Sequence, residues 1–105
     1  MADKDKTSEL KDTAVHFLVK GKKIRAKEFF YKVLVIDPTD TFARKKVAEL
    51  LEQEGDLEAA IDHYERLIDI YDKKHMRHYA CAVAKRLIEI DAFNTFAKEY
   101  LIKHN

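Results

Sequence analysis

Apolar residues recur every three or four positions along most of the chain, which is the period of an amphipathic helix. The first stripe runs from Leu10 through Ala14 and Phe17, and it predicts a helix that ends near Gly21. Stripes of the same period predict further helices over about 26–36, 42–55, 57–74 and 79–90, followed by a short closing helix over 95–105. The pattern therefore predicts an all-α chain of about six helices.

Residues that stop helices are scarce and evenly placed. The 105 residues contain two glycines and one proline, and Gly21, Pro38 and Gly55 follow one another at equal intervals. Glycine takes the left-handed turn that ends a helix, and proline removes a backbone donor, so the helix before Pro38 must end by about Asp37. All-β folds and glycine-loop nucleotide folds need turn residues far more often, and both are excluded.

The chain contains an internal repeat. Residues 7–40 match residues 41–74 in class without a gap, and residues 37–45 match 91–99 at a larger offset, so one helix length is missing from a third unit. Asp72 stands where a second Pro38 would fall, and we therefore expect the fourth helix to run unbroken from about Leu57 to Lys74 and to serve two repeats, with His75 as the next turn. The class matches of the first offset are Ala14 with Ala48, Phe17 with Leu51, Gly21 with Gly55, Ala26 with Ala60, Phe30 with Tyr64, Val33 with Leu67, and Ile36 with Ile70.

The repeated unit resembles the tetratricopeptide repeat family, a helix-turn-helix of about 34 residues with small, aromatic and proline residues at fixed places. The resemblance implies a right-handed superhelical solenoid of antiparallel helices. Residues 1–105 then form one domain, with a polar start at 1–7 and the closing helix at 95–105. In the third unit, Ile68 stands at a usually small place and Ala84 at a usually aromatic one. The residues that carry the resemblance in the first unit are Ala14, Phe17, Gly21, Ala26, Phe30 and Pro38.

By the same resemblance, the expected function is that of a protein–protein interaction module, a scaffold or adaptor that binds a partner peptide or helix in the concave groove of the repeats. Some members of the family clamp the tails of heat-shock chaperones with Lys and Asn side chains. Lys11 matches that clamp, but Val15 and Lys46 stand where its asparagines would be, so this clamp is not expected. The residues expected to line the groove are Lys11, Val15, Leu18, Val19, Phe42, Lys45, Glu49 and Glu52.

The formal net charge of +1 conceals three blocks of alternating sign. Residues 1–34 carry a net charge of +4, residues 35–72 carry −7, and residues 73–105 carry +4. A nucleic-acid-associated adaptor is the third candidate function. The near-neutral total and the acidic middle block argue against it, because phosphate binding needs a concentrated basic face. Short basic runs such as 44–46 are interpreted as solvated helix ends.

The same charge blocks support a second candidate, a self-assembling structural module in which the basic ends meet the acidic middle of another copy. Near the end of the chain, Phe96, Tyr100 and Leu101 form an apolar stripe that offers a contact for a homo-oligomer. The preferred interpretation of this stripe is that the closing helix folds back onto the fifth helix, and the remaining alternative is that the natural protein continues beyond residue 105.

Candidate chemistry is sparse. Ser8 is the only serine, and no nucleophile with a supporting base, cofactor loop or acid–base pair is evident, so neither enzyme activity nor a cofactor is expected. His75, His78 and Cys81 have metal-ligand spacing on one helical face. A fourth ligand is not evident, and we expect Cys81 to be a small buried residue rather than a metal ligand.

The expected location is cytoplasmic, without a membrane partner. No apolar run approaches the roughly 18–20 residues of a membrane span. The first residues are charged rather than an apolar signal core. Cys81 is the only cysteine, which is in keeping with a reducing compartment.

Overall fold

The computed structural model describes residues 2–104, with side chains from Lys6 onward, and this part of the chain is all-helical without a strand. Each helix packs mainly against its neighbours in sequence, as in a helical repeat solenoid. The helices are α1 (Ala2–Val19), α2 (Lys23–Ile36), α3 (Thr41–Gln53), α4 (Leu57–Lys73), α5 (Arg77–Ile90) and α6 (Thr95–His104).

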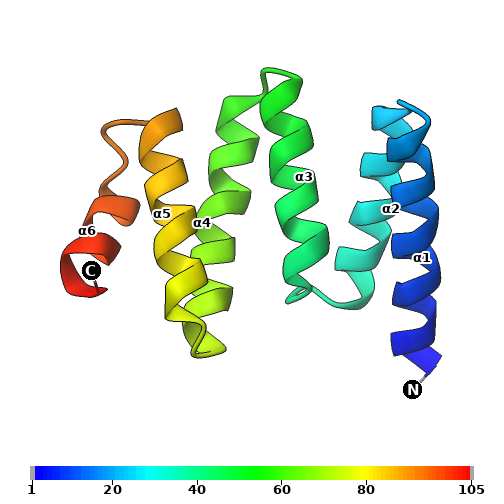
Figure 1. Ribbon diagram of the computed structural model, residues 1–105, viewed down its shortest axis with the longest axis horizontal. Coiled ribbons are helices and arrows are strands. Elements are labelled where there is room, and N and C mark those ends of the chain that lie inside the picture. The colour runs from blue at the N-terminus through cyan, green and yellow to red at the C-terminus, as the bar shows by residue number, and fades with distance from the viewer. Residues whose placement is uncertain (1, 105) are drawn as a thin grey trace.

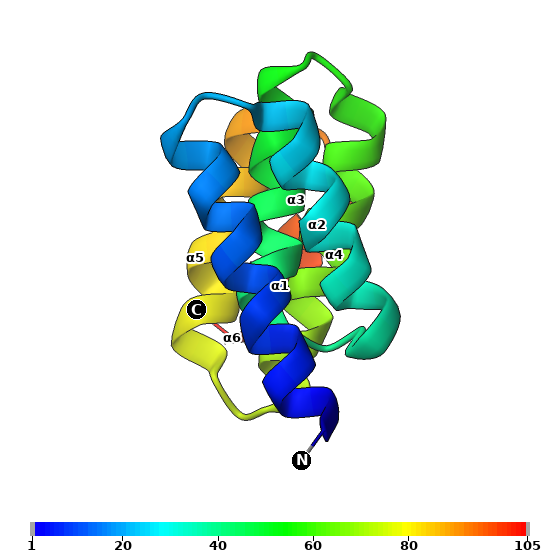
Figure 2. The ribbon, with the colours of Figure 1, turned by 90° about the vertical axis from the view of Figure 1, so that its right-hand side faces the viewer.

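The helices form two layers. Helices α1, α3 and α5 lie side by side in one layer, and α2 and α4 lie behind them (Figure 1). Figure 2 shows the same two layers from the α1 end of the molecule. The principal extents are 38 × 32 × 18 Å, and the smallest of these corresponds to two helices of about 10 Å each. Helix α6 closes the end of the solenoid beside α5.

Helices α1, α3 and α4 end in the same kind of turn. Its central residue has a positive φ, of 77° at Gly21, 84° at Gly55 and 61° at His75. In each turn the N–H of this residue donates to the carbonyl three positions back, and the next N–H donates to the carbonyl five positions back. Helix α4 therefore follows one such turn and ends in the next. The expected unbroken helix over about 57–74 is confirmed, and it packs against both α3 and α5.

The turns before α3 and α6 repeat each other, as the match of residues 37–45 with 91–99 predicts. The side chain of Asp40 accepts from the backbone N–H of Ala43 at 2.9 Å, and so caps α3. The side chain of Asn94 accepts from the N–H of Ala97 at 2.8 Å in the same way at the start of α6. Both caps satisfy a backbone donor that the helix itself cannot pair.

The third unit closes by an exchange of large and small residues. Ala14 and Phe30 of the first unit are fully buried, and so are Ile68 and Ala84 at the matching positions of α4 and α5. The large residue thus moves from the second helix of the pair to the first. Because all four side chains are fully buried, the third unit is packed although it departs from the pattern of the first.

The first and last helices differ in how far the sequence predicted them. Helix α1 already begins at Ala2, ahead of its apolar stripe, since no glycine or proline interrupts the polar start. Helix α6 folds back onto the solenoid: Tyr100 is buried and its hydroxyl donates to Asp72 at 2.8 Å, while Leu101 packs against the core. Among residues 2–104, no helix combines the length and the apolar character needed to cross a membrane.

Candidate functional site

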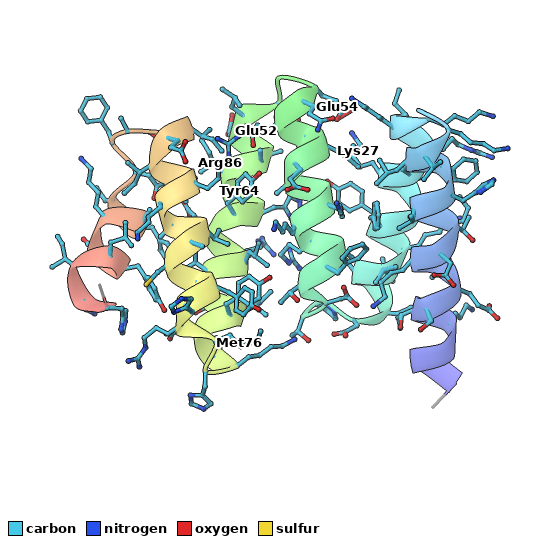
Figure 3. All side chains as sticks on the ribbon, in the orientation of Figure 1. Lys27, Glu52, Glu54, Tyr64, Met76 and Arg86 are labelled. Atoms are coloured by element: carbon cyan, nitrogen blue, oxygen red, sulfur yellow. The ribbon has the colours of Figure 1, made fainter. Side chains whose placement is uncertain are left out.

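A hollow of about 560 Å³ opens between α3 and α5, with α4 beneath it. We call it the α3–α5 groove. Helix α3 supplies one wall, α5 supplies the other, and Tyr64 of α4 lies between them. Figure 3 shows Glu52, Tyr64 and Arg86 gathered between the two walls. The lining residues are Lys45, Glu49, Glu52, Gln53, Tyr64, Ala82, Val83 and Arg86.

The α3 wall follows from the two faces of that helix. Its apolar residues other than Phe42, among them Val47, are buried against the neighbouring helices. The remaining face carries Lys45, Glu49 and Glu52 at spacings of four and three positions, which place them on one side of the helix. Burial of the apolar stripe therefore leaves this charged face toward the groove.

Glu52 links the three helices of the groove. One of its carboxylate oxygens accepts from the Tyr64 hydroxyl at 2.9 Å, and the other accepts from the Arg86 guanidinium. Burial, together with this hydrogen bond, raises the pKa of Tyr64 well above its ordinary value, so the phenol stays protonated and donates. The Glu52 side chain is 22% exposed and that of Arg86 is 48% exposed, so the guanidinium stays accessible from the groove.

The charges of the groove balance. Two cations, Lys45 and Arg86, and two carboxylates, Glu49 and Glu52, line it, while Ala82 and Val83 add apolar surface from α5. This surface presents apolar contact and charges of both signs to a peptide.

The expected groove residues of α1 lie elsewhere. The Lys11 ammonium pairs at 2.7 Å with Asp40, the residue that caps α3, and Leu18 packs against the core. Val15 and Val19 are 38% and 81% exposed, but they do not line the groove. Phe42 is also outside the lining. Its side chain is 44% exposed. The structure thus brings together Lys45, Glu49 and Glu52 of the predicted set, and not the residues of α1.

Five residues of this lining, among them Tyr64 and Arg86, were missed from the sequence. The alignment that matches 37–45 with 91–99 places Arg86 opposite Lys32 of α2, outside any expected groove. A signal was nevertheless present, because Arg86 follows Glu52 by one full repeat length, just as residue 41 follows residue 7. Residues one repeat apart lie at equivalent places on stacked units.

The metal-ligand spacing of His75, His78 and Cys81 does not produce a cluster. His75 occupies the turn after α4, and the thiol of the half-buried Cys81 lies 4.0 Å from the carbonyl oxygen of His104. Over the residues that the structure describes, no three His, Cys, Asp or Glu side chains gather as a metal site would require.

No protein-family model matches the chain, and no curated protein matches it either. The likeness to tetratricopeptide repeats therefore stays an expectation from the residue pattern. What the structure itself shows is an all-helical chain whose consecutive helices stack as in a helical repeat solenoid.

Proposed function

We propose that this chain is a protein–protein interaction module that binds a peptide or helix of a partner in the α3–α5 groove. The observation that carries the proposal is the groove itself. One wall is the α3 face predicted from the sequence, and the other wall adds apolar and cationic groups from α5.

The groove provides an apolar contact surface for a partner and charged groups that orient it. An apolar side chain of the partner packs against Ala82 and Val83, and removal of this surface from water drives binding. Lys45 and Glu49 fix the orientation of the bound segment, since they present opposite charges one helical turn apart on the same wall.

The groove is also held in shape before binding. The bonds of Glu52 to Tyr64 and Arg86 join α3, α4 and α5, so little further ordering of the walls is required. A preformed site of this kind loses less entropy on association than a flexible one.

Photo-cross-linking in the native host tests the proposal. A photoreactive amino acid replaces the exposed Ala82 in the groove, and the matched control carries it at Glu28, an exposed position on α2. We expect a single cross-linked complex with a partner protein when the photoreactive residue stands at position 82, and none when it stands at position 28. The exchange Lys45→Glu with Glu49→Lys, which preserves net charge, should abolish it. The same product from position 28, or a product that is indifferent to the exchange, would contradict the proposal.

A further inference from the structure

A second hollow, of about 520 Å³, lies on the other side of α4. Residues such as Asp62, Arg66 and Lys73 line it, and they stand about half a turn around the helix from Tyr64. The α2–α3 turn and α6 complete its walls. We call it the Arg44 hollow. Its lining residues are Pro38, Thr39, Arg44, Asp62, Glu65, Arg66, Asp69, Ile70, Lys73, Lys74 and Phe96.

Arg44 is a buried cation at this hollow with only part of its hydrogen-bonding capacity used. Arg44 is only 6% exposed to solvent. Its Nη1 lies 3.0 Å from Nδ1 of His63, and its Nη2 donates to the carbonyl oxygen of Pro38 at 2.8 Å. The buried Nε has no hydrogen-bond partner. A guanidinium has five N–H donors, and the described residues give Arg44 an acceptor at Nη1 and at Nη2 but none at the buried Nε.

No carboxylate pairs with Arg44 among the side chains that the structure describes, although three carboxylates line the same hollow. A buried charge without a counter-charge is costly, and an anion that enters the hollow would relieve that cost. Burial, followed by the nearby Arg66 cation, lowers the pKa of the Arg44 guanidinium, and the Asp62 carboxylate offsets only part of this shift. The three carboxylates are engaged elsewhere: Asp62 with Arg66 at 3.1 Å, Asp69 with Lys73 at 3.0 Å, and Glu65 with Asn94 at 2.8 Å.

The rest of the lining defines which anion fits. Pro38, Ile70 and Phe96 contribute apolar surface, and Phe96 is 41% exposed. The lining carries four cations and three carboxylates, so one positive charge is left without a counter-charge, and a single carboxylate matches it better than a phosphate of higher charge. A phosphate would also leave the apolar surface in water. A single carboxylate with a bulky apolar neighbour satisfies both parts of the hollow.

We propose that the Arg44 hollow is a second binding site, for a protein segment in which an Asp or Glu side chain stands beside bulky apolar residues. The carboxylate accepts hydrogen bonds from the Arg44 guanidinium, and the apolar neighbours pack on Ile70 and Phe96. This site lies on the opposite side of α4 from the α3–α5 groove, and it does not depend on the function proposed for that groove.

Nuclear magnetic resonance titration of the full ¹⁵N-labelled chain tests this site. The probe is the blocked tripeptide Asp-Leu-Phe, and its matched control is Asn-Leu-Phe, which has the same shape without the charge. We expect the Asp peptide to shift the Arg44 Nε–H signal together with the amide signal of Ile70, and to bind roughly tenfold or more tightly than the Asn peptide, since a hydrogen bond to a charged group is lost.

Variants separate a local site from a general effect. Arg44→Gln should remove the preference for Asp over Asn, and Phe96→Ser should weaken the Asp peptide even if Arg44→Gln proves too unstable to study. The control Lys46→Gln changes a cation of α3 outside the hollow and should leave the affinity unchanged. Equal binding of both peptides, no shift at Arg44, or the same shifts from inorganic phosphate alone would overturn the proposal.

Discussion

His75 is the position where one substitution tests the three-turn arrangement most sharply. Its φ of 61° lies in the left-handed region, which costs a residue with a Cβ about 1–2 kcal/mol, whereas Gly21 and Gly55 hold the same place in the other two turns. His75 is exposed, so His75→Gly removes no core packing. The greater freedom of glycine in the unfolded chain offsets about 0.5–1 kcal/mol of the gain. The net expectation is a rise of about 0.5–1 kcal/mol in the free energy of unfolding.

Urea and thermal unfolding of the variant measure this effect, and the expected rise in Tm is roughly 2–6 °C. The matched change is Gly55→Ala. A Cβ at Gly55 would meet nothing within 4 Å, so no clash contributes, and the expected loss of about 0.5–1 kcal/mol is the cost of the φ of 84° less the smaller freedom of alanine in the unfolded chain. If His75→Gly were neutral or destabilising while Gly55→Ala still lowered stability, the third turn would not share the conformation of the second, and the reasoning would be refuted.

Other substitutions test the pH dependence, the core and the closing helix. Nδ1 of the half-buried His63 can only accept from a guanidinium, and burial lowers its pKa. As the pH falls through 6.5, His63 therefore takes up a proton in the unfolded chain before it does so in the folded chain, and the free energy of unfolding should fall below that pH. Urea unfolding at a series of pH values measures this, and the same fall in the His63→Gln variant would contradict it. Leu67→Ala, at a fully buried residue of α4, should lower the free energy of unfolding by about 2–5 kcal/mol. Ile102→Ala, at a residue that is 81% exposed, should change it by less than about 0.5 kcal/mol at any protein concentration. A loss at Ile102 that depends on protein concentration would instead indicate contact between copies of the chain. Asn94→Ala removes the cap bond to Ala97 and should cost about 1 kcal/mol with faster hydrogen exchange in α6, and unchanged exchange there would argue against the cap.

The helices and their ends were predictable because each has a local cause. Helix α2 ends at Ile36, two residues before Pro38, and α4 runs through the place where the matching proline is absent. The start of α1 at Ala2 was not predictable from the apolar stripe, because the polar first residues carry no stripe. Nothing in that segment breaks a helix, however, and the helix continues through it.

The groove was predictable only on its α3 side, since that wall is the complement of a buried apolar stripe. The other wall depends on stacking. Helix α5 resembles α2 in sequence, but it lies in the layer of α1 and α3 (Figure 1), which brings Arg86 to Glu52. The interpretation of residues 44–46 as a solvated basic run was wrong for Arg44, because α4 and the α2–α3 turn cover it while Lys45 stays exposed. Neither outcome can be derived from the pattern of one helix.

A calorimetric titration in which the α3–α5 groove is filled tests the central proposal most directly. The titrant is the segment of the partner that position 82 captures by cross-linking. Ala82→Trp places an indole in the groove, and Ala92→Trp adds the same bulk at an exposed position of the α5–α6 turn. We predict that Ala82→Trp raises the Kd at least about tenfold and that Ala92→Trp leaves it within about twofold of the native value. Native affinity in the Ala82→Trp variant would contradict the account, because the partner segment would then bind somewhere other than the groove.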